Sequence, residues 1–316
     1  MTNSLLLVAI SFAIAIILTP ILKQIGIKFK IYDVADGDEL KIHKKPIPPL
    51  GGLAIMISLF TIIIIYLIKG SAEANQVIAI VVAGLIIGLF GLYDDLKWKH
   101  VTQANPKVKV AVQQILIIAV SVLFYFVNIS SPIIPIAVVS IFIIFCFING
   151  LINAVNLQDG MDGLAGGIIL ISSVGFAIVS KGLGIEIVYI MSLGLVGAIF
   201  GFLVFNFNPA KIFMGDNGSF FLGLIIAIFA IFTINQPYNF VLLIGVIFVI
   251  GLPIFDMAFA ILRRIINSKP IFLGDRSHIY DLIHKHVSSI KKTVVIYYCI
   301  QLIFVLGGIS IIKFFG

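Results

Sequence analysis

The most constraining feature of this chain is a succession of apolar segments, each about twenty residues long and nearly free of charged side chains. A helix needs ~20 such residues to cross the hydrocarbon core of a bilayer. Lipid supplies no water to unpaired backbone groups, so each segment is predicted to be helical. The ten predicted spans cover residues 3–22, 48–69, 74–92, 108–128, 132–148, 163–180, 184–204, 217–234, 239–262 and 293–313.

The composition indicates a single membrane domain. Of the 316 residues, 61% are hydrophobic and 11% are charged, whereas soluble domains carry about 25% charged residues. No polar stretch is long enough for a separate soluble domain, so residues 1–316 are predicted to form one all-α, polytopic membrane domain. The first span lacks a basic leading region, which favours a retained helix over a signal peptide. Cys146 and Cys299 lie inside apolar runs and are predicted to be small, buried hydrophobic side chains.

The polar connections between the spans alternate in length and charge. Five long connections, at 23–47, 93–109, 149–162, 205–219 and 263–292, contain all five His and all but three of the 21 Lys and Arg residues. The positive-inside rule places such connections in the cytoplasm, and an even number of spans then leaves both termini outside. Membrane topology therefore explains the net charge of +7, which gives no indication of nucleic-acid binding.

Asp94 and Asp95 end the third predicted span, at the cytoplasmic interface. Two adjacent carboxylates repel each other, which can leave a base beside an acid. They could also bind a divalent cation. The alternative is a solvated helix end, although the C-terminus of a helix disfavours anions.

The connection 149–162 contains the strongest local pattern, with Asn153, Asn156, Asp159 and Asp162 spaced three residues apart. These four side chains lie near one another if the backbone is helical. The segment contains no basic residue, which indicates an oxygen-ligand metal site or a polar substrate cleft. The alternative is helix capping together with hydrogen bonds between helices.

Asp216 lies in the glycine-rich segment Gly215–Ser219, which opens the eighth predicted span. Glycine lets the backbone approach a ligand closely. The N-terminus of the following helix favours an anion such as phosphate, with or without a cation on Asp216. The alternative is a helix N-cap formed by Asp216 or Asn217.

Four basic residues are candidates for binding phosphate. In the last long connection, Arg276 offers bidentate recognition and His278 can donate a hydrogen bond or act in acid–base chemistry. Lys45 precedes the second span and Lys109 begins the fourth, and either could neutralise a phosphate. Juxtamembrane lysines also anchor to lipid headgroups, which remains the alternative for both.

These motifs, in this order, resemble those of the polyprenyl-phosphate N-acetylhexosamine-1-phosphate transferases of glycosyltransferase family 4. The resemblance covers most of the chain, and all five long connections contribute to it. The matching stretches are His43–Gly52, Asp94 with Asp95, Lys109 with Gln113, Asn153–Gly163, Gly215–Ser219, Pro253–Asp256 with Arg263 and Arg264, and His278.

The resemblance implies a reaction at the membrane surface. A polyprenyl phosphate attacks the sugar-linked phosphate of a UDP-N-acetylamino sugar, which gives polyprenyl-diphosphate-sugar and UMP and initiates a cell-envelope glycan. The family requires Mg²⁺, with Mn²⁺ as an alternative ion. The resemblance further implies a multi-pass protein of the cell membrane with its active site facing the cytoplasm, and it is compatible with a homodimer.

The resemblance also implies a role for each matching polar residue. Asp216 and Asn156 are the expected metal-site residues. Asp94, Asp95, Asp159, Asp162 and His278 are the expected catalytic residues, the first two acting on the lipid phosphate and the next two at the nucleotide-sugar site. Lys45, Lys109, Asn153 and Arg276 are the expected substrate-binding residues.

One motif departs from the family pattern. Many of these transferases carry a His-x-His-His cluster in the last loop, where this chain has His278 followed by Ile279, Tyr280 and Asp281. The triple-histidine signature of the muramoyl-pentapeptide branch is also absent. The departure argues against a peptidoglycan-precursor enzyme, and it leaves both a plain N-acetylglucosamine and a modified amino sugar open.

Three other functions compete with this interpretation. A transporter places ionisable residues near the bilayer midplane, yet only Asp256 lies well inside a predicted span. A CDP-alcohol phosphotransferase carries an Ala-Arg pair after its first Asp-Gly, and no such pair follows Asp159 or Asp162 here. A non-catalytic membrane scaffold would tolerate loss of Asp216 without any change in glycan synthesis.

Overall fold

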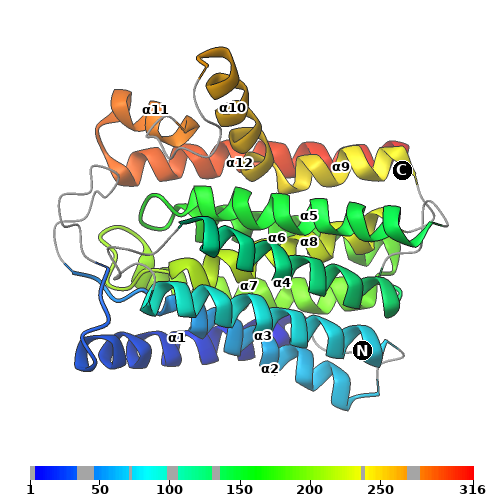
Figure 1. Ribbon diagram of the computed structural model, residues 1–316, viewed down its shortest axis with the longest axis horizontal. Helices are drawn as coiled ribbons and strands as arrows, with labels where there is room; N and C mark the ends of the chain where they lie inside the picture. Colours follow the sequence, from blue (N-terminus) through cyan, green and yellow to red (C-terminus); the bar gives the residue numbers. More distant parts are fainter. Residues whose placement is uncertain are drawn as a thin grey trace.

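The computed structural model describes residues 4–33, 46–70, 73–97, 106–129, 136–235, 239–268 and 278–316. Within these ranges every regular element is a helix, and most helices run along the long axis of the molecule (Figure 1). The helices are α1 (Ser4–Lys28), α2 (Gly51–Ile68), α3 (Ala74–Leu96), α4 (Pro106–Phe126), α5 (Ala137–Gln158), α6 (Leu164–Leu183), α7 (Glu186–Asn206), α8 (Gly215–Ile234), α9 (Phe240–Ile250), α10 (Leu252–Ile266), α11 (Ile279–Val287) and α12 (Ile290–Phe315).

The number of spans agrees with the sequence prediction. Nine helices in the described part of the chain are long and apolar enough to cross a membrane, and α9 with α10 forms a tenth span if the bent pair counts as one. The prediction of an all-α, polytopic membrane protein is therefore confirmed.

The ninth predicted span, 239–262, is wrong as a single straight helix. α9 and α10 meet at an angle of 86°, at Gly251 with φ of +65°. Glycine adopts this conformation without steric strain, and Pro253 has no N–H with which to continue the hydrogen bonds of α9. The break exposes backbone groups in a water-free environment, where each must find a partner. The Gln301 side chain of α12 supplies them, because Oε1 accepts from Leu252 N at 2.8 Å and Nε2 donates to Ile250 O at 3.0 Å.

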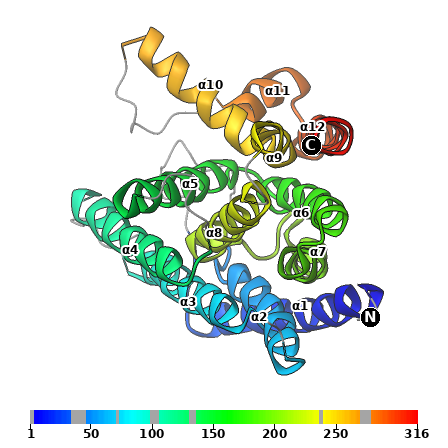
Figure 2. The same cartoon turned by 90° about the vertical axis from the view of Figure 1, so that its right-hand side faces the viewer.

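α8 forms the centre of the bundle. The apolar window of this helix is completely buried within the protein, and α8 packs against α2, α3, α5, α6 and α9. Figure 2 shows it surrounded by its neighbours. A helix that is apolar on all sides is expected to be buried, so the predicted span 217–234 is the core of the fold.

Glycines set how closely the helices approach α8. A Cβ on Gly52 of α2 would lie 2.3 Å from Gly218 Cα, and a Cβ on Gly91 of α3 would lie 2.5 Å from Asp216 O. Small residues of this kind let helix backbones touch in membranes, where packing drives association. Gly52 and Gly91 therefore place α2 and α3 against the backbone of α8.

The helix connections divide between the two ends of the bundle. α3 and α5 end where α4 and α8 begin, since side chains from these four helices contact one another there. The N-terminus and the C-terminus both lie at the opposite end (Figures 1 and 2). An even number of crossings accounts for both termini lying at one end, and the outside location of that end stays a prediction.

The prediction for the two cysteines is wrong. Cys146 on α5 and Cys299 on α12 are both exposed on the outer surface of the bundle. In a membrane protein the outer surface is as apolar as the interior, because lipid replaces water around it. An apolar sequence environment therefore does not distinguish a lipid-facing side chain from a buried one.

Substitution Gly91→Ala is expected to destabilise the protein by about 1–3 kcal/mol, because the new methyl group overlaps the backbone of α8. The measurement is the midpoint of thermal unfolding of the purified protein in detergent. Gly150→Ala in α5 is the matched control, since a Cβ there meets nothing within 4 Å. Equal midpoints for the two variants would show that the contact between α3 and α8 is not tight.

Candidate active site

Five polar side chains from four helices meet at the end of the bundle opposite the termini. Lys109 Nζ of α4 lies 2.5 Å from Asp94 Oδ2 of α3 and 3.3 Å from Asp216 Oδ2 of α8. Asn156 Nδ2 of α5 donates to Asp216 Oδ1 at 3.1 Å and to Ser219 Oγ at 2.9 Å. We call Asp94, Lys109, Asn156, Asp216 and Ser219 the carboxylate cluster.

The cluster combines two carboxylates with a single ammonium group. Asp94 is fully buried, and its Oδ1 atom finds no hydrogen-bond donor in the part of the chain that the structure describes. The side chains of Lys109 and Asp216 are 33% and 14% exposed, so the cluster opens towards solvent on their side. A buried carboxylate oxygen without a donor is costly, and this one is available to a cation or to a proton.

Asp95 has a different environment from its neighbour. Its two carboxylate oxygens accept hydrogen bonds from Asp216 N and Asn217 N, each at 3.1 Å, in the first turn of α8. An anion at this position also complements the positive end of the helix dipole. Asp95 therefore caps α8 from α3 and fixes the backbone that carries Asp216.

The alternative that Asp216 or Asn217 caps its own helix is wrong. The N-cap position of α8 is occupied by Met214, and the Asp216 side chain contacts Lys109 and Asn156. Asn217 Nδ2 donates instead to Gly88 O of α3 at 2.6 Å. Both side chains therefore contact other helices, while Asp95 accepts from the first-turn amides of α8.

The prediction that residues 149–162 are helical is correct only as far as Gln158. α5 ends at Gln158 and Asp159 is its C-cap, so Asn153 and Asn156 lie on the helix while Asp159 and Asp162 follow it. Gly163, with φ of +79°, then starts α6 in a left-handed conformation. The helical pattern stops here because glycine favours a turn over the helix interior.

Asn153, Asn156 and Asp162 also bond to different parts of the protein. Asn153 Nδ2 donates to Asn149 O at 2.7 Å, one turn back along α5. Asp162 Oδ2 accepts from Asn208 Nδ2 at 2.8 Å and from Ala210 N at 2.9 Å, which ties the start of α6 to the loop that leads into α8. Of the four residues predicted to lie together, Asn156 belongs to the carboxylate cluster, whereas these hydrogen bonds of Asn153 and Asp162 lie elsewhere.

His278 lies immediately before α11, and its side chain is almost completely buried. Its Nδ1 atom is 3.0 Å from Asp256 Oδ2 of α10. Its ring stacks on Tyr280, with the ring centres 5.4 Å apart. The other two predicted phosphate ligands, Lys45 and Arg276, lie outside the described residues.

Two polar residues of this region were not assigned any role from the sequence. Ser219 lies one helical turn after Asp216, and this spacing was a signal that both share a face of α8. Gln158 Nε2 donates to Asp256 Oδ2 at 2.7 Å. Nothing in the sequence indicated that pairing, since the two residues are far apart in the chain.

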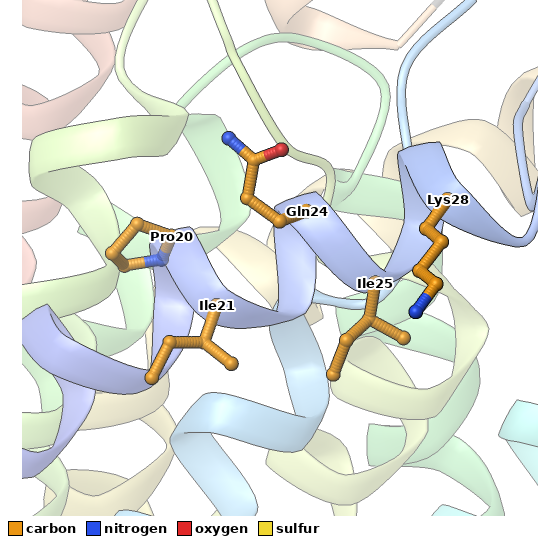
Figure 3. Close-up of a pocket in the computed structure, with 5 residues that line it drawn as sticks. All are labelled: Pro20, Ile21, Gln24, Ile25 and Lys28. Atoms are coloured by element: carbon orange, nitrogen blue, oxygen red, sulfur yellow. The ribbon is translucent and has the colours of Figure 1, made fainter.

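A surface groove elsewhere on the protein carries none of this chemistry. It lies on α1 and is lined by Pro20, Ile21, Gln24, Ile25 and Lys28 (Figure 3). The lining contains no carboxylate and none of the predicted site residues. This groove is separate from the carboxylate cluster, which is formed by α3, α4, α5 and α8.

Comparison with known proteins places this arrangement among carbohydrate enzymes. The model of glycosyl transferase family 4 matches residues 77–234, which include the whole carboxylate cluster. A probable undecaprenyl-phosphate N-acetylglucosaminyl 1-phosphate transferase from Bacillus subtilis (strain 168) is 34% identical, over 95% of this chain and 82% of its own. A phospho-N-acetylmuramoyl-pentapeptide-transferase from Staphylococcus aureus (strain MSSA476) is 31% identical, over 98% of both chains.

Asp95→Asn is expected to destabilise the protein by about 1–3 kcal/mol, because an amide NH₂ group then faces one of the two backbone N–H donors of α8. Asp94→Asn is the matched control and is expected to change stability by less than about 1 kcal/mol, since its remaining oxygen still accepts from Lys109. Thermal unfolding in detergent measures both. A larger loss for Asp94→Asn would contradict the capping role of Asp95.

Proposed function

Because this chain belongs to glycosyl transferase family 4, we propose that it transfers an N-acetylamino sugar 1-phosphate from a UDP-sugar to polyprenyl phosphate. The products are polyprenyl-diphosphate-sugar and UMP, and the reaction starts a cell-envelope glycan. The observation that carries the proposal is the carboxylate cluster, in which Asp94 and Asp216 share the ammonium group of Lys109. The names of the two relatives support the same class of reaction.

The proposed chemistry is a direct displacement at phosphorus. An oxygen of the lipid phosphate forms a bond to the phosphorus that carries the sugar, and the bond from that phosphorus to the bridging oxygen breaks. UMP leaves with the bridging oxygen. Such a reaction depends mainly on positioning and on neutralisation of charge, and a protein of this kind needs no covalent intermediate.

Three residues of the cluster, together with Asp95, have a proposed task in this reaction. Lys109 neutralises phosphate oxygens, and it is the most exposed of the charged groups in the cluster. Asp94 offers its free Oδ1 oxygen to the lipid phosphate, either as a proton acceptor or through a cation. Asn156 orients Asp216 by its hydrogen bond, and Asp95 fixes the same residue through the backbone of α8.

The residues of the cluster fit a Mg²⁺ ion. Mg²⁺ prefers oxygen ligands and is usually held by one or two carboxylates together with substrate phosphates and water. The cluster offers carboxylate oxygens on Asp216 and Asp94, including a buried oxygen without a donor. The described residues contain no group of three His, Cys, Asp or Glu side chains that could hold a metal alone, which agrees with a site completed by substrate. When bound, the ion supplies positive charge to the transferred phosphate.

The proposed site also suits two substrates of opposite solubility. Polyprenyl phosphate is held in the bilayer, whereas a UDP-sugar is dissolved in water, so the reaction belongs at a helix end where both can reach. The basic connections at this end favour the cytoplasmic side. Lys45 and Arg276 are proposed to bind further phosphate oxygens, and Asp159, Asp162 and Asn153 to shape the nucleotide-sugar site.

The test is UMP release by the detergent-purified protein with polyprenyl phosphate, a UDP-amino sugar and Mg²⁺. Release is expected to require the lipid and to stop with EDTA. Asp216→Asn and Asp94→Asn are each expected to lower kcat by about 10²-fold or more. Thr233→Val is the control, because its buried hydroxyl donates to Phe229 O within α8. Unchanged kcat in both Asn variants would refute the assignment of the site.

The absence of the triple-histidine motif predicts which UDP-sugar the protein uses as its substrate. A simple UDP-N-acetylamino sugar is expected to give a higher kcat/KM than UDP-N-acetylmuramoyl-pentapeptide. The comparison uses the same UMP assay with a panel of UDP-amino sugars. A preference for the pentapeptide donor would show that the last loop does not set the branch of the family.

A further inference from the structure

Asp256 is a fully buried carboxylate that the proposed reaction does not use. Three donors converge on it from two other segments of the chain, the end of α5 and the start of α11. Ile279 N donates to Oδ1 at 2.7 Å, while Gln158 Nε2 and His278 Nδ1 approach Oδ2 at 2.7 and 3.0 Å. A buried charged group is retained only where partners compensate for the loss of water, so this arrangement fixes the end of α5 and the start of α11 relative to α10.

The contacts of Asp256 hold the start of α11. Its bond to Ile279 N satisfies one of the amides that a helix leaves unpaired in its first turn. His278 N donates in addition to Asp281 Oδ2 at 3.3 Å. Because the neighbouring residue His278 is bonded through its ring, Asp256 determines both the direction of α11 and the orientation of the imidazole.

The last turn of α5 connects this arrangement to the carboxylate cluster. Asn156 contacts Asp216 on one side of the turn. Gln158 contacts Asp256 on the other side, and Leu157 O accepts from the Tyr280 hydroxyl at 3.2 Å. Three consecutive residues of α5 therefore join the cluster to the segment that carries His278.

α10 itself is held rigidly where it begins. Gln301 bonds to the backbone on both sides of the break, and its Nε2 also donates to Ser172 Oγ of α6 at 2.9 Å. A Cβ on Gly251 would lie 2.5 Å from Gln301 Oε1, so the amide fits closely against the break. Asp256 lies just over one helical turn beyond this joint.

We propose that Asp256, joined to α5 by Gln158, is a positioning residue that places His278 against a phosphate oxygen of the substrates. The proposal rests on the proposed function above. A carboxylate oxygen accepts hydrogen bonds, so Nδ1 of His278 carries the proton in this pair and Nε2 is the ring atom presented to substrate. Asp256 touches neither substrate nor the reacting phosphorus.

Asp256→Asn tests the proposal because it preserves size but removes one acceptor oxygen. Oδ1 can still accept from Ile279 N, whereas an NH₂ group then faces both Gln158 Nε2 and His278 Nδ1. The imidazole must turn away or exchange the roles of its two nitrogens. A misplacement of this kind is expected to lower kcat/KM by about 10²-fold.

A double-mutant cycle separates positioning from a general structural role. UMP release is measured for the wild type, Asp256→Asn, His278→Ala and the double variant. If Asp256 acts through His278, the double variant is expected to lie within about threefold of His278→Ala, since coupled residues are not additive. Wild-type kcat/KM in Asp256→Asn, or a double variant whose loss is the product of both single losses, would overturn the proposal.

Hydrogen exchange gives a readout that does not depend on activity. Peptides that cover α11 are expected to exchange faster in Asp256→Asn than in the wild type, while those of α8 stay unchanged. If the wild type releases no UMP, the proposed function fails, and faster exchange of α11 still supports the positioning contact. Unchanged exchange of α11 refutes it.

Gln158→Met provides a second variant if Asp256→Asn does not fold. It removes one of the three donors, keeps the shape of the side chain and leaves the carboxylate in place. Faster exchange of α11 and lower kcat/KM are expected, with Thr233→Val as the control. Wild-type values for both measurements would overturn the proposed connection through α5.

Discussion

The structure depends on a single constraint, which is that a backbone in lipid must satisfy its own hydrogen bonds. The constraint makes each crossing a helix and leaves the helix ends as the places where polar side chains can gather. The carboxylate cluster lies at such ends, formed by the last turns of α3 and α5 and the first turns of α4 and α8. The break at Gly251 follows the same constraint, because Gln301 supplies the missing partners.

Close packing around α8 brings the reactive groups together. Gly91 lets α3 approach the first turn of α8, and only at that distance can Asp95 cap the helix while Asp94 points to Lys109. The two adjacent aspartates thus divide two tasks between them. One orders the backbone that carries Asp216, and the other keeps an oxygen available to the cluster.

Much of the fold and part of the site were predictable from the sequence. Spans follow from apolar length, and the family motifs identified Asp94, Lys109, Asn156 and Asp216, which the structure brings together. Contacts between distant segments, such as Gln158 with Asp256, were not predictable. Hydropathy describes each segment separately and does not indicate which segments pack together. The break in the ninth span was missed since α9 and α10 are apolar on both sides of Gly251. The cysteines were misjudged because lipid and protein interior look alike in sequence.

The joint between α9 and α10 has a consequence for motion. α9 has 11 residues and is about 16 Å long, so the joint falls inside a hydrocarbon core of ~30 Å. Opening it would strip the Gln301 contacts from backbone groups that no water can reach, at several kcal/mol for each group. Glycine is often found at the hinge of a moving lid, but Gly251 lies at a rigid bend because Gln301 holds the backbone on both sides of it. We therefore expect α10 to keep its angle to α9 when substrates bind.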